Sequence, residues 1–227
     1  MLRSLLGFYK CRHLIISADI CYNIVMKNHI LTQSRLKAAG LGAYFHPRDV
    51  QPLGVSFFRL QQLVAEGSVE KVCRGLYRLA AVEPGEFETI AMVKSAIPGG
   101  IVCLLSALRI HGIGTQAPSA VWIALDRKGR KPSRLPARVQ TVRFSGAMLT
   151  YGVQTRAIMG VPVRVTSPAR TVVDCFRYRN KIGVDVAIEA LREALRSRKA
   201  TVDEITRAAE VCRARGMVRI YLQALSP

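Results

Sequence analysis

The segment from residue 31 to residue 80 constrains the fold most, because glycines divide it into three short helical patterns followed by a basic hairpin. Glycine readily adopts the left-handed backbone conformation that ends a helix. The helical patterns span residues 32–39, 46–53 and 56–66, and the hairpin strands span residues 69–71 and 76–79. Three short helices and a hairpin are the layout of a winged helix-turn-helix, whose last helix enters the DNA major groove. The sequence therefore predicts a winged-helix domain over residues 31–80.

The third helical pattern has one apolar face, formed by Leu60, Leu63 and Val64, and its remaining positions are mostly polar. We predict that Ser56 caps this helix and that the polar positions face base edges, namely Ser56, Arg59, Gln61 and Gln62. The hairpin cations predicted to contact phosphates are Lys71, Arg74 and Arg78. Phe57 and Phe58 cannot both enter so small a core. Either one packs inward while the other covers the wing, or one contacts a thymine methyl group.

The charge of the chain indicates the chemistry of its partner. The 227 residues include 34 Lys and Arg against 15 Asp and Glu, which gives a formal net charge of +19. A surface this basic favours a polyanion. Nucleic acid fits better than a membrane, because the sequence has no long basic amphipathic helix. We therefore expect double-stranded DNA, and no membrane, as the partner.

The cysteines indicate a reducing compartment. Six are scattered along the chain without any Cys-x-x-Cys pair, at positions 11, 21, 73, 103, 175 and 212. This spacing favours neither a disulfide framework nor a zinc site. We expect reduced thiols in a cytoplasmic protein that uses no metal and no cofactor.

The first thirty residues do not share the pattern of the rest. Apolar runs alternate there with cations such as Arg3 and Lys10, without helical or strand periodicity. The runs are too short and interrupted for a secretory signal or a membrane span. We predict that residues 1–30 form an extension outside the fold and that translation starts at Met26.

Beyond the winged helix, residues 81–86 are predicted to form a linker, because Glu83-Pro84-Gly85 favours a turn. Strands are predicted at residues 120–125, 139–144, 152–158 and 161–165. Helices are predicted at residues 87–97, 107–111, 168–176, 184–197, 201–214 and 218–225. The fold class is therefore α+β: an N-terminal winged helix-turn-helix followed by a mixed α/β domain, residues 87–227, that ends in a helical cluster. Since each half has its own apolar pattern, we expect each half to fold alone.

A basic loop joins two of the predicted strands, over residues 126–138. Its cations include Arg127, Lys128, Arg130 and Lys131. Two interpretations are open. The loop is either a solvated connection or an arm that contacts DNA phosphates and adds affinity without specificity.

Several motifs resemble a known family. They are Tyr44-Phe45-His46-Pro47, Gly54-Val55-Ser56, Glu66-Gly67, Arg74-Gly75-Leu76-Tyr77-Arg78-Leu79, Leu105-Ser106-Ala107-Leu108, His111-Gly112 and Thr166-Ser167-Pro168-Ala169-Arg170-Thr171-Val172-Val173-Asp174. Together they resemble AbiEi-type antitoxins of bacterial type IV toxin–antitoxin systems, from about residue 31 to residue 225. The chain departs from the family pattern at Phe57-Phe58, where such proteins more often carry polar or basic residues.

The resemblance implies a repressor that binds its own promoter through the winged helix. It also implies a C-terminal domain that counters a nucleotidyltransferase toxin, usually without forming a stable complex with it. Polar residues in apolar surroundings are then candidates for the antitoxin surface: Ser106, His111, Arg170, Thr171 and Asp174. The simpler interpretations are that His111 caps a helix and that Arg170 and Asp174, four residues apart, form an intrahelical ion pair.

The sequence does not favour an enzyme. No aspartate is followed by a Glu-x-Lys strand that would hold a divalent metal, and no GxxxxGK loop is present. Two alternatives to the repressor and antitoxin stay open. One is a nucleic-acid-processing enzyme that its winged helix docks on the substrate, and the other is a transcriptional regulator without a toxin.

Overall fold

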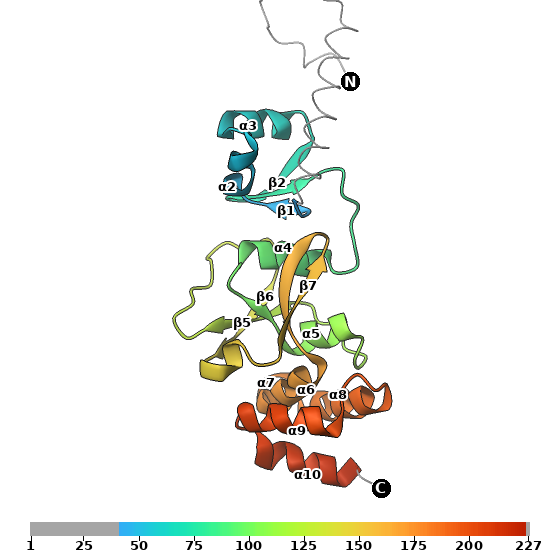
Figure 1. Ribbon diagram of the computed structural model, residues 1–227. Helices are drawn as coiled ribbons and strands as arrows, with labels where there is room; N and C mark the ends of the chain where they lie inside the picture. The colour runs from blue at the N-terminus through green and yellow to red at the C-terminus, as the bar shows by residue number, and fades with distance from the viewer. Residues whose placement is uncertain (1–40, 226–227) are drawn as a thin grey trace, which may run out of the picture.

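The computed structural model describes residues 41–225, and Figure 1 shows their elements following one another along the length of the molecule. The predicted helix 32–39 and the predicted extension 1–30 lie outside the described residues. The described chain folds into helices and two sheets, so the predicted mixed α+β class is confirmed at this level. No helix within residues 41–225 is long and apolar enough to cross a membrane.

The first sheet lies toward one end of the molecule in Figure 1, has the strand order β1-β3-β2 and is antiparallel. Two helical segments separated by a turn at Gly54, which has a φ of 81°, pack on it. As predicted, the Ser56 hydroxyl caps the third helical pattern by accepting the backbone N–H of Arg59 at 3.2 Å. The core between helices and sheet contains Phe45, Val50, Leu60, Leu63, Val69, Tyr77 and Leu79. The elements are β1 (Tyr44–Phe45), α2 (Pro47–Val50), η1 (Gln51–Leu53), α3 (Phe57–Ala65), β2 (Val69–Cys73) and β3 (Leu76–Leu79).

The second sheet occupies the middle of the molecule and has the strand order β6-β5-β4-β8-β7. It is mixed, because β4 pairs parallel with β8 and β5 parallel with β6, whereas the other two pairs are antiparallel. Helix α4 contacts β8 and β5, helix α5 contacts β5, and Arg170 of α6 (Pro168–Arg177) stacks on Phe144 of β6. The elements are α4 (Glu88–Ala96), β4 (Ile101–Val102), α5 (Leu104–His111), β5 (Val121–Asp126), β6 (Val139–Phe144), η2 (Gly146–Leu149), β7 (Val153–Ile158) and β8 (Val161–Thr166).

The predicted helical cluster forms the other end of the molecule (Figure 1). Its central helix is α6, which contacts α5, α8 and α9. Ser167 caps α6 and Pro168 occupies its first position, as predicted. Thr201 and Glu204 form the capping box at the start of α9. The elements are α6 (Pro168–Arg177), α7 (Arg179–Ile182), α8 (Val184–Arg196), α9 (Val202–Val211) and α10 (Arg215–Leu225).

A close backbone contact joins the two sheets. The N–H of Ala43 donates to the carbonyl of Met159 at 2.8 Å, at the turn between β7 and β8. A Cβ on Gly42 would lie 2.8 Å from the carbonyl of Gly160, so only glycine fits at this point without a shift of the backbone. Tyr44 belongs to the same apolar cluster as residues of α4 and β8. The part of the chain before residue 81 is thus packed directly on the part after residue 86, and the predicted linker boundaries stay a prediction.

Candidate nucleic-acid interface

One face of α3 is open to solvent. Leu60 and Leu63 are 1% exposed and anchor the helix on its inner side. Phe58 and Gln61 are exposed on the opposite side, and helical spacing places the half-buried Gln62 beside them. Phe57 is 66% exposed and Phe58 72%, so the interpretation in which one of them packs inward is wrong. Helical periodicity correctly indicated the outer positions of the helix. Burial was expected at Phe58 nevertheless, because a large apolar ring usually packs inward.

The remaining predicted base-reading residues are hydrogen-bonded within the same region. The Arg59 guanidinium donates to Gln62 Oε1 at 3.1 Å and lies 3.0 Å from Glu66 Oε1. Arg59 therefore lies along the flank of α3, where its charge is balanced by Glu66. The amide of Gln61 donates to the Tyr77 hydroxyl at 3.3 Å. These contacts orient the polar side chains without burying them.

The cations of the β2–β3 hairpin differ in their surroundings. Lys71 and Arg74 are exposed and form no ion pair with another described residue. Arg78 has a side chain only 13% exposed, and its guanidinium lies 3.1 Å from Glu70 and 3.2 Å from Glu88. Two carboxylates already balance the charge of Arg78, so it is less suited to phosphate than Lys71 and Arg74, and its contact with phosphate stays a prediction.

His46 holds the turn of the hairpin in place, a role that sequence reasoning missed. Its Nδ1 lies 2.6 Å from the carbonyl oxygen of Gly75 in the turn. Its Nε2 lies 2.8 Å from the carbonyl oxygen of Ser95 at the end of α4. The turn that carries Arg74 is thereby tied to the second sheet's helix. The motif around His46 was visible in the sequence, but its two partners lie far away along the chain.

The basic loop between β5 and β6 is anchored at its base. Arg143 donates to the carbonyls of Asp126 and Gly129, and Lys131 donates to the carbonyl of Val139 at 3.0 Å. The Lys131 ammonium group therefore already has a hydrogen-bond partner within the protein. The four predicted phosphate contacts, Arg127, Lys128, Arg130 and Lys131, are all exposed, and none forms an ion pair with another described residue.

The five residues predicted for the antitoxin surface lie inside the C-terminal half. Their exposed fractions are 2% for Ser106, 7% for His111 and 0% for Arg170, Thr171 and Asp174. The structure corrects the expectation of a surface, because side chains this deeply buried cannot contact another molecule in this conformation. Apolar neighbours in sequence mark burial as readily as they mark a site, which is why the motif was ambiguous.

Arg170 is the centre of this buried set. Its Nε donates to both carboxylate oxygens of Asp174, at 2.9 and 3.0 Å, so the simpler interpretation of an intrahelical pair is confirmed. Its other nitrogens donate to the carbonyls of Tyr151 and Met148 at 2.8 and 3.2 Å. The guanidinium also stacks 4.9 Å from the ring centroid of Phe144. Burial raises the pKa of Asp174 to about 6, although the Arg170 charge opposes this shift. This pair joins α6 to the β6–β7 connection.

The other members of the set tie helices to strands. Ser106 Oγ accepts the backbone N–H of Trp122 at 2.9 Å, and His111 Nε2 lies 2.6 Å from the carbonyl of Thr166. The Thr171 hydroxyl lies 2.7 Å from that of Thr166. Burial lowers the pKa of His111, against the opposing hydrogen bond to Thr166. Among the described residues, no group of three or more His, Cys, Asp or Glu side chains is arranged to hold a metal ion.

Comparison with known proteins places this geometry in context. Residues 100–223 match the family model of the AbiEi antitoxin C-terminal domain. The crystal structure of the RV2827C protein from Mycobacterium tuberculosis matches over 82% of this chain and 71% of that chain, with a TM-score of 0.55 and 13% identity. At this identity the likeness concerns the fold alone. The chain matches no curated protein.

Proposed function

The chain belongs to the AbiEi antitoxin family, and we propose that it is the antitoxin of a type IV toxin–antitoxin system and also represses its own operon. In this proposal residues 31–80 bind double-stranded promoter DNA as a winged helix. The C-terminal half counters a nucleotidyltransferase toxin in the cytoplasm without forming a stable complex with it. The chain acts by binding and carries out no catalysis.

The observation that carries the DNA-binding role is the open face of α3. Phe58, Gln61 and Gln62 lie on the side of the helix opposite the anchors Leu60 and Leu63. A helix that is fixed by its inner face and presents amide side chains outward fits the major groove. Ser56, at the N-cap, lies at the same end of the helix as Phe58.

Each side chain on this face suits a particular contact. A glutamine amide can bond the N6 and N7 positions of adenine, and an aromatic ring can contact the methyl group of thymine. We therefore assign Gln61 and Gln62 to base edges and Phe58 to a thymine methyl group. Lys71 and Arg74 have charges that no described carboxylate balances, so they are suited to phosphates.

Binding of the full chain to its own upstream DNA tests this assignment. We expect Phe58→Ala and Gln61→Ala to lose about 1–3 kcal/mol of discrimination at one base pair each. Arg74→Ala should weaken binding to all sequences alike and reduce the slope of log affinity against log salt by about one unit. These values are measured by titrating promoter and scrambled fragments at several salt concentrations.

A matched control removes a cation from the far end of the molecule. Arg219 is exposed on α10, and Figure 1 shows α10 at the end opposite α3. Arg219→Ala should bind both fragments like the wild type. If Arg74→Ala and Phe58→Ala also bound like the wild type, α3 and the hairpin would not be the DNA interface.

The antitoxin role is supported by the family match over residues 100–223. Co-expression with the toxin tests it. We expect the chain to restore growth of cells that express the nucleotidyltransferase encoded beside its gene. An inactive toxin variant provides the control for nonspecific effects on growth. Unrestored growth despite normal levels of the folded chain would remove the antitoxin role.

A further inference from the structure

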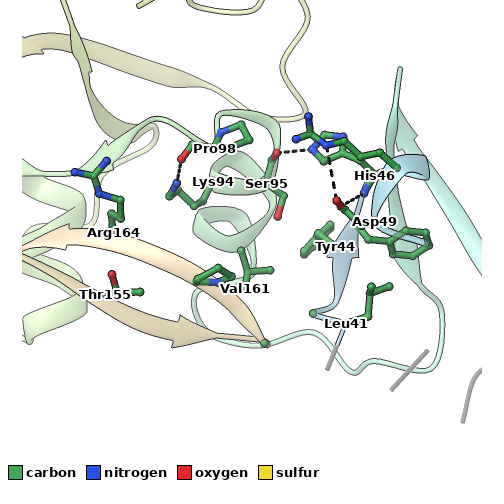
Figure 2. Close-up of a pocket in the computed structure, with 15 residues that line it drawn as sticks. Leu41, Tyr44, His46, Asp49, Lys94, Ser95, Pro98, Thr155, Val161 and Arg164 are labelled. Carbon is green, nitrogen blue, oxygen red and sulfur yellow. Dashed lines mark hydrogen bonds and ion pairs between the residues drawn. The ribbon is translucent and has the colours of Figure 1, made fainter. Parts of the chain in front are cut away.

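A cavity of about 530 Å³ lies where the two parts of the chain meet (Figure 2). One wall comes from β1 and α2, and the others come from the end of α4 and from β7 and β8. Its volume falls in the range of about 300–1,000 Å³ that is usual for small-molecule sites. The polar side chains that line it include His46, Asp49, Lys94, Thr155 and Arg164.

Two cations line this cavity without a carboxylate partner. Lys94 is 4% exposed, and Figure 2 shows its ammonium group donating to the carbonyl of Pro98. Arg164, on β8, donates to the carbonyl of Leu149 at 2.9 Å. Neither forms an ion pair with another residue in the described part of the chain. This arrangement lacks a counter-ion. Because an unpaired buried charge is costly, it favours the binding of an anion.

The titration of Lys94 agrees with this geometry. Burial, together with a smaller contribution from repulsion by the nearby Arg164 guanidinium, lowers the pKa of Lys94 from 10.5 to about 8. The pKa of a lysine beside a carboxylate would shift upward instead. The two side chains therefore act on each other as like charges at the wall of one cavity.

His46 lies at the same wall of the cavity. Both of its ring nitrogens face carbonyl oxygens, at 2.6 and 2.8 Å. The carboxylate that lines the cavity, that of Asp49, accepts the backbone N–H of His46 and lies 3.7 Å from Arg48. Its charge is therefore balanced by Arg48.

We propose that this cavity binds a small phosphate-bearing anion, with Lys94 and Arg164 as the charged groups that contact it. Phosphate suits the site because two positive charges can balance a dianion and because amine and guanidinium donors match its oxygens. The volume holds a nucleoside monophosphate as well as inorganic phosphate. Walls from both parts of the chain would enclose the anion, so it would bridge them. The site does not depend on the proposed binding of DNA or on the antitoxin role.

Calorimetric titration of the full chain tests the proposal, with inorganic phosphate and AMP as probes at constant ionic strength. We expect saturable binding of at least one probe with a dissociation constant below about 1 mM. Equal affinity for both probes would identify the phosphate group as the ligand, and tighter binding of AMP would identify a nucleotide. The absence of saturable binding for both would overturn the proposal.

Three variants locate the binding. Lys94→Met keeps the length of the buried side chain and removes its charge, and we expect it to weaken binding about tenfold or more. Arg164→Gln should act in the same direction. Lys181→Met removes the same charge from an exposed position on α7, and it should bind like the wild type. Thermal melts establish that each variant is folded. Equal binding by folded Lys94→Met and Arg164→Gln would place the anion elsewhere and overturn the proposal.

Discussion

Arg170 and Asp174 form an ion pair whose two side chains are both 0% exposed. Removing one partner of such a pair leaves a buried charge without compensation, which typically costs about 3–5 kcal/mol. We therefore expect Asp174→Ala to lower the free energy of unfolding by about that amount, as measured by urea denaturation. The loss arises in the folded state, because Arg170 would remain enclosed among α6, η2 and Phe144.

An exposed ion pair gives the matched control. Glu210 and Arg215 lie 3.3 Å apart, and their side chains are 48% and 68% exposed. Glu210→Ala should change stability by less than about 1 kcal/mol, because water screens this pair. A similar loss in both variants would mean that burial does not decide the strength of the pair. The result also matters for growth assays, since an Asp174 variant that fails to protect cells is informative only if it is folded.

Lys94 gives the chain a dependence of stability on pH. Its pKa is lowered by burial and by Arg164, from 10.5 to about 8. Between these values the unfolded chain holds a proton that the folded chain has released, so stability rises with pH from about 8 to 10.5. Below pH 8 the lysine is charged in both states, so the destabilisation caused by its buried charge no longer changes with pH. We expect Lys94→Met to raise the free energy of unfolding at neutral pH by about 1–3 kcal/mol.

Urea denaturation of the wild type and Lys94→Met across this pH range provides the measurement. The difference between them should vanish above pH 10.5, where the lysine is neutral in both states. Lys128→Met, at an exposed position, should show no such difference at any pH. If Lys94→Met raised the free energy of unfolding equally at all pH values, the effect would come from packing and not from charge.

At the scale of the elements, the sequence predicted most helices and strands because glycine and proline mark their ends. The helix predicted at 87–97 is α4 (Glu88–Ala96), and the strand predicted at 139–144 is β6 (Val139–Phe144). The two-residue strands β1 and β4 were missed, since segments this short carry no periodicity of their own. Their pairing partners are set by the tertiary fold.

The site was less predictable than the fold. The outer positions of α3 followed from helical spacing, as at Gln61, but the partners of a charged side chain did not. Arg78 pairs with Glu88 in a different element, and His46 with carbonyls of the hairpin turn and α4. Such contacts join residues that are distant in sequence, so no local pattern indicates them. For the same reason Arg170 and Asp174 could be recognised as a pair but not as a buried one.

The loop between β5 and β6 lies beside the central sheet in Figure 1, away from α3. A duplex that ran along the molecule would contact both, whereas a duplex across α3 alone would not reach the loop. If the loop contacts phosphates, replacing Arg127, Lys128 and Arg130 together by alanine should reduce the salt slope by up to about three units. Affinity for all sequences should fall alike. An unchanged slope would identify the loop as a solvated connection.

At the scale of the whole molecule, the contact between the two sheets limits how independent they are. Tyr44 and Leu76 belong to one apolar cluster with Ile90 and Val161. Removing the first part of the chain would expose this surface to water. The sequence predicted that each half folds alone, and we now expect a fragment of residues 86–227 to be folded but less stable than the full chain.

The proposed division of labour between the two parts leads to the final prediction, made on the full chain. Phe58 and Arg74 are exposed and contribute nothing to the apolar clusters, so the double variant Phe58→Ala/Arg74→Ala should fold normally. We expect it to lose repression of its promoter in a reporter assay while still protecting cells from the toxin. The reason is that the family match, over residues 100–223, lies entirely outside the substituted region. A folded double variant that lost both activities would show that protection also requires the DNA-binding part.

The fragment of residues 86–227 gives the converse test, since it should protect cells without repressing. If the fragment were folded by thermal melt and never protected cells from the adjacent toxin, protection could not be assigned to the C-terminal half, and only the proposal of a repressor would remain.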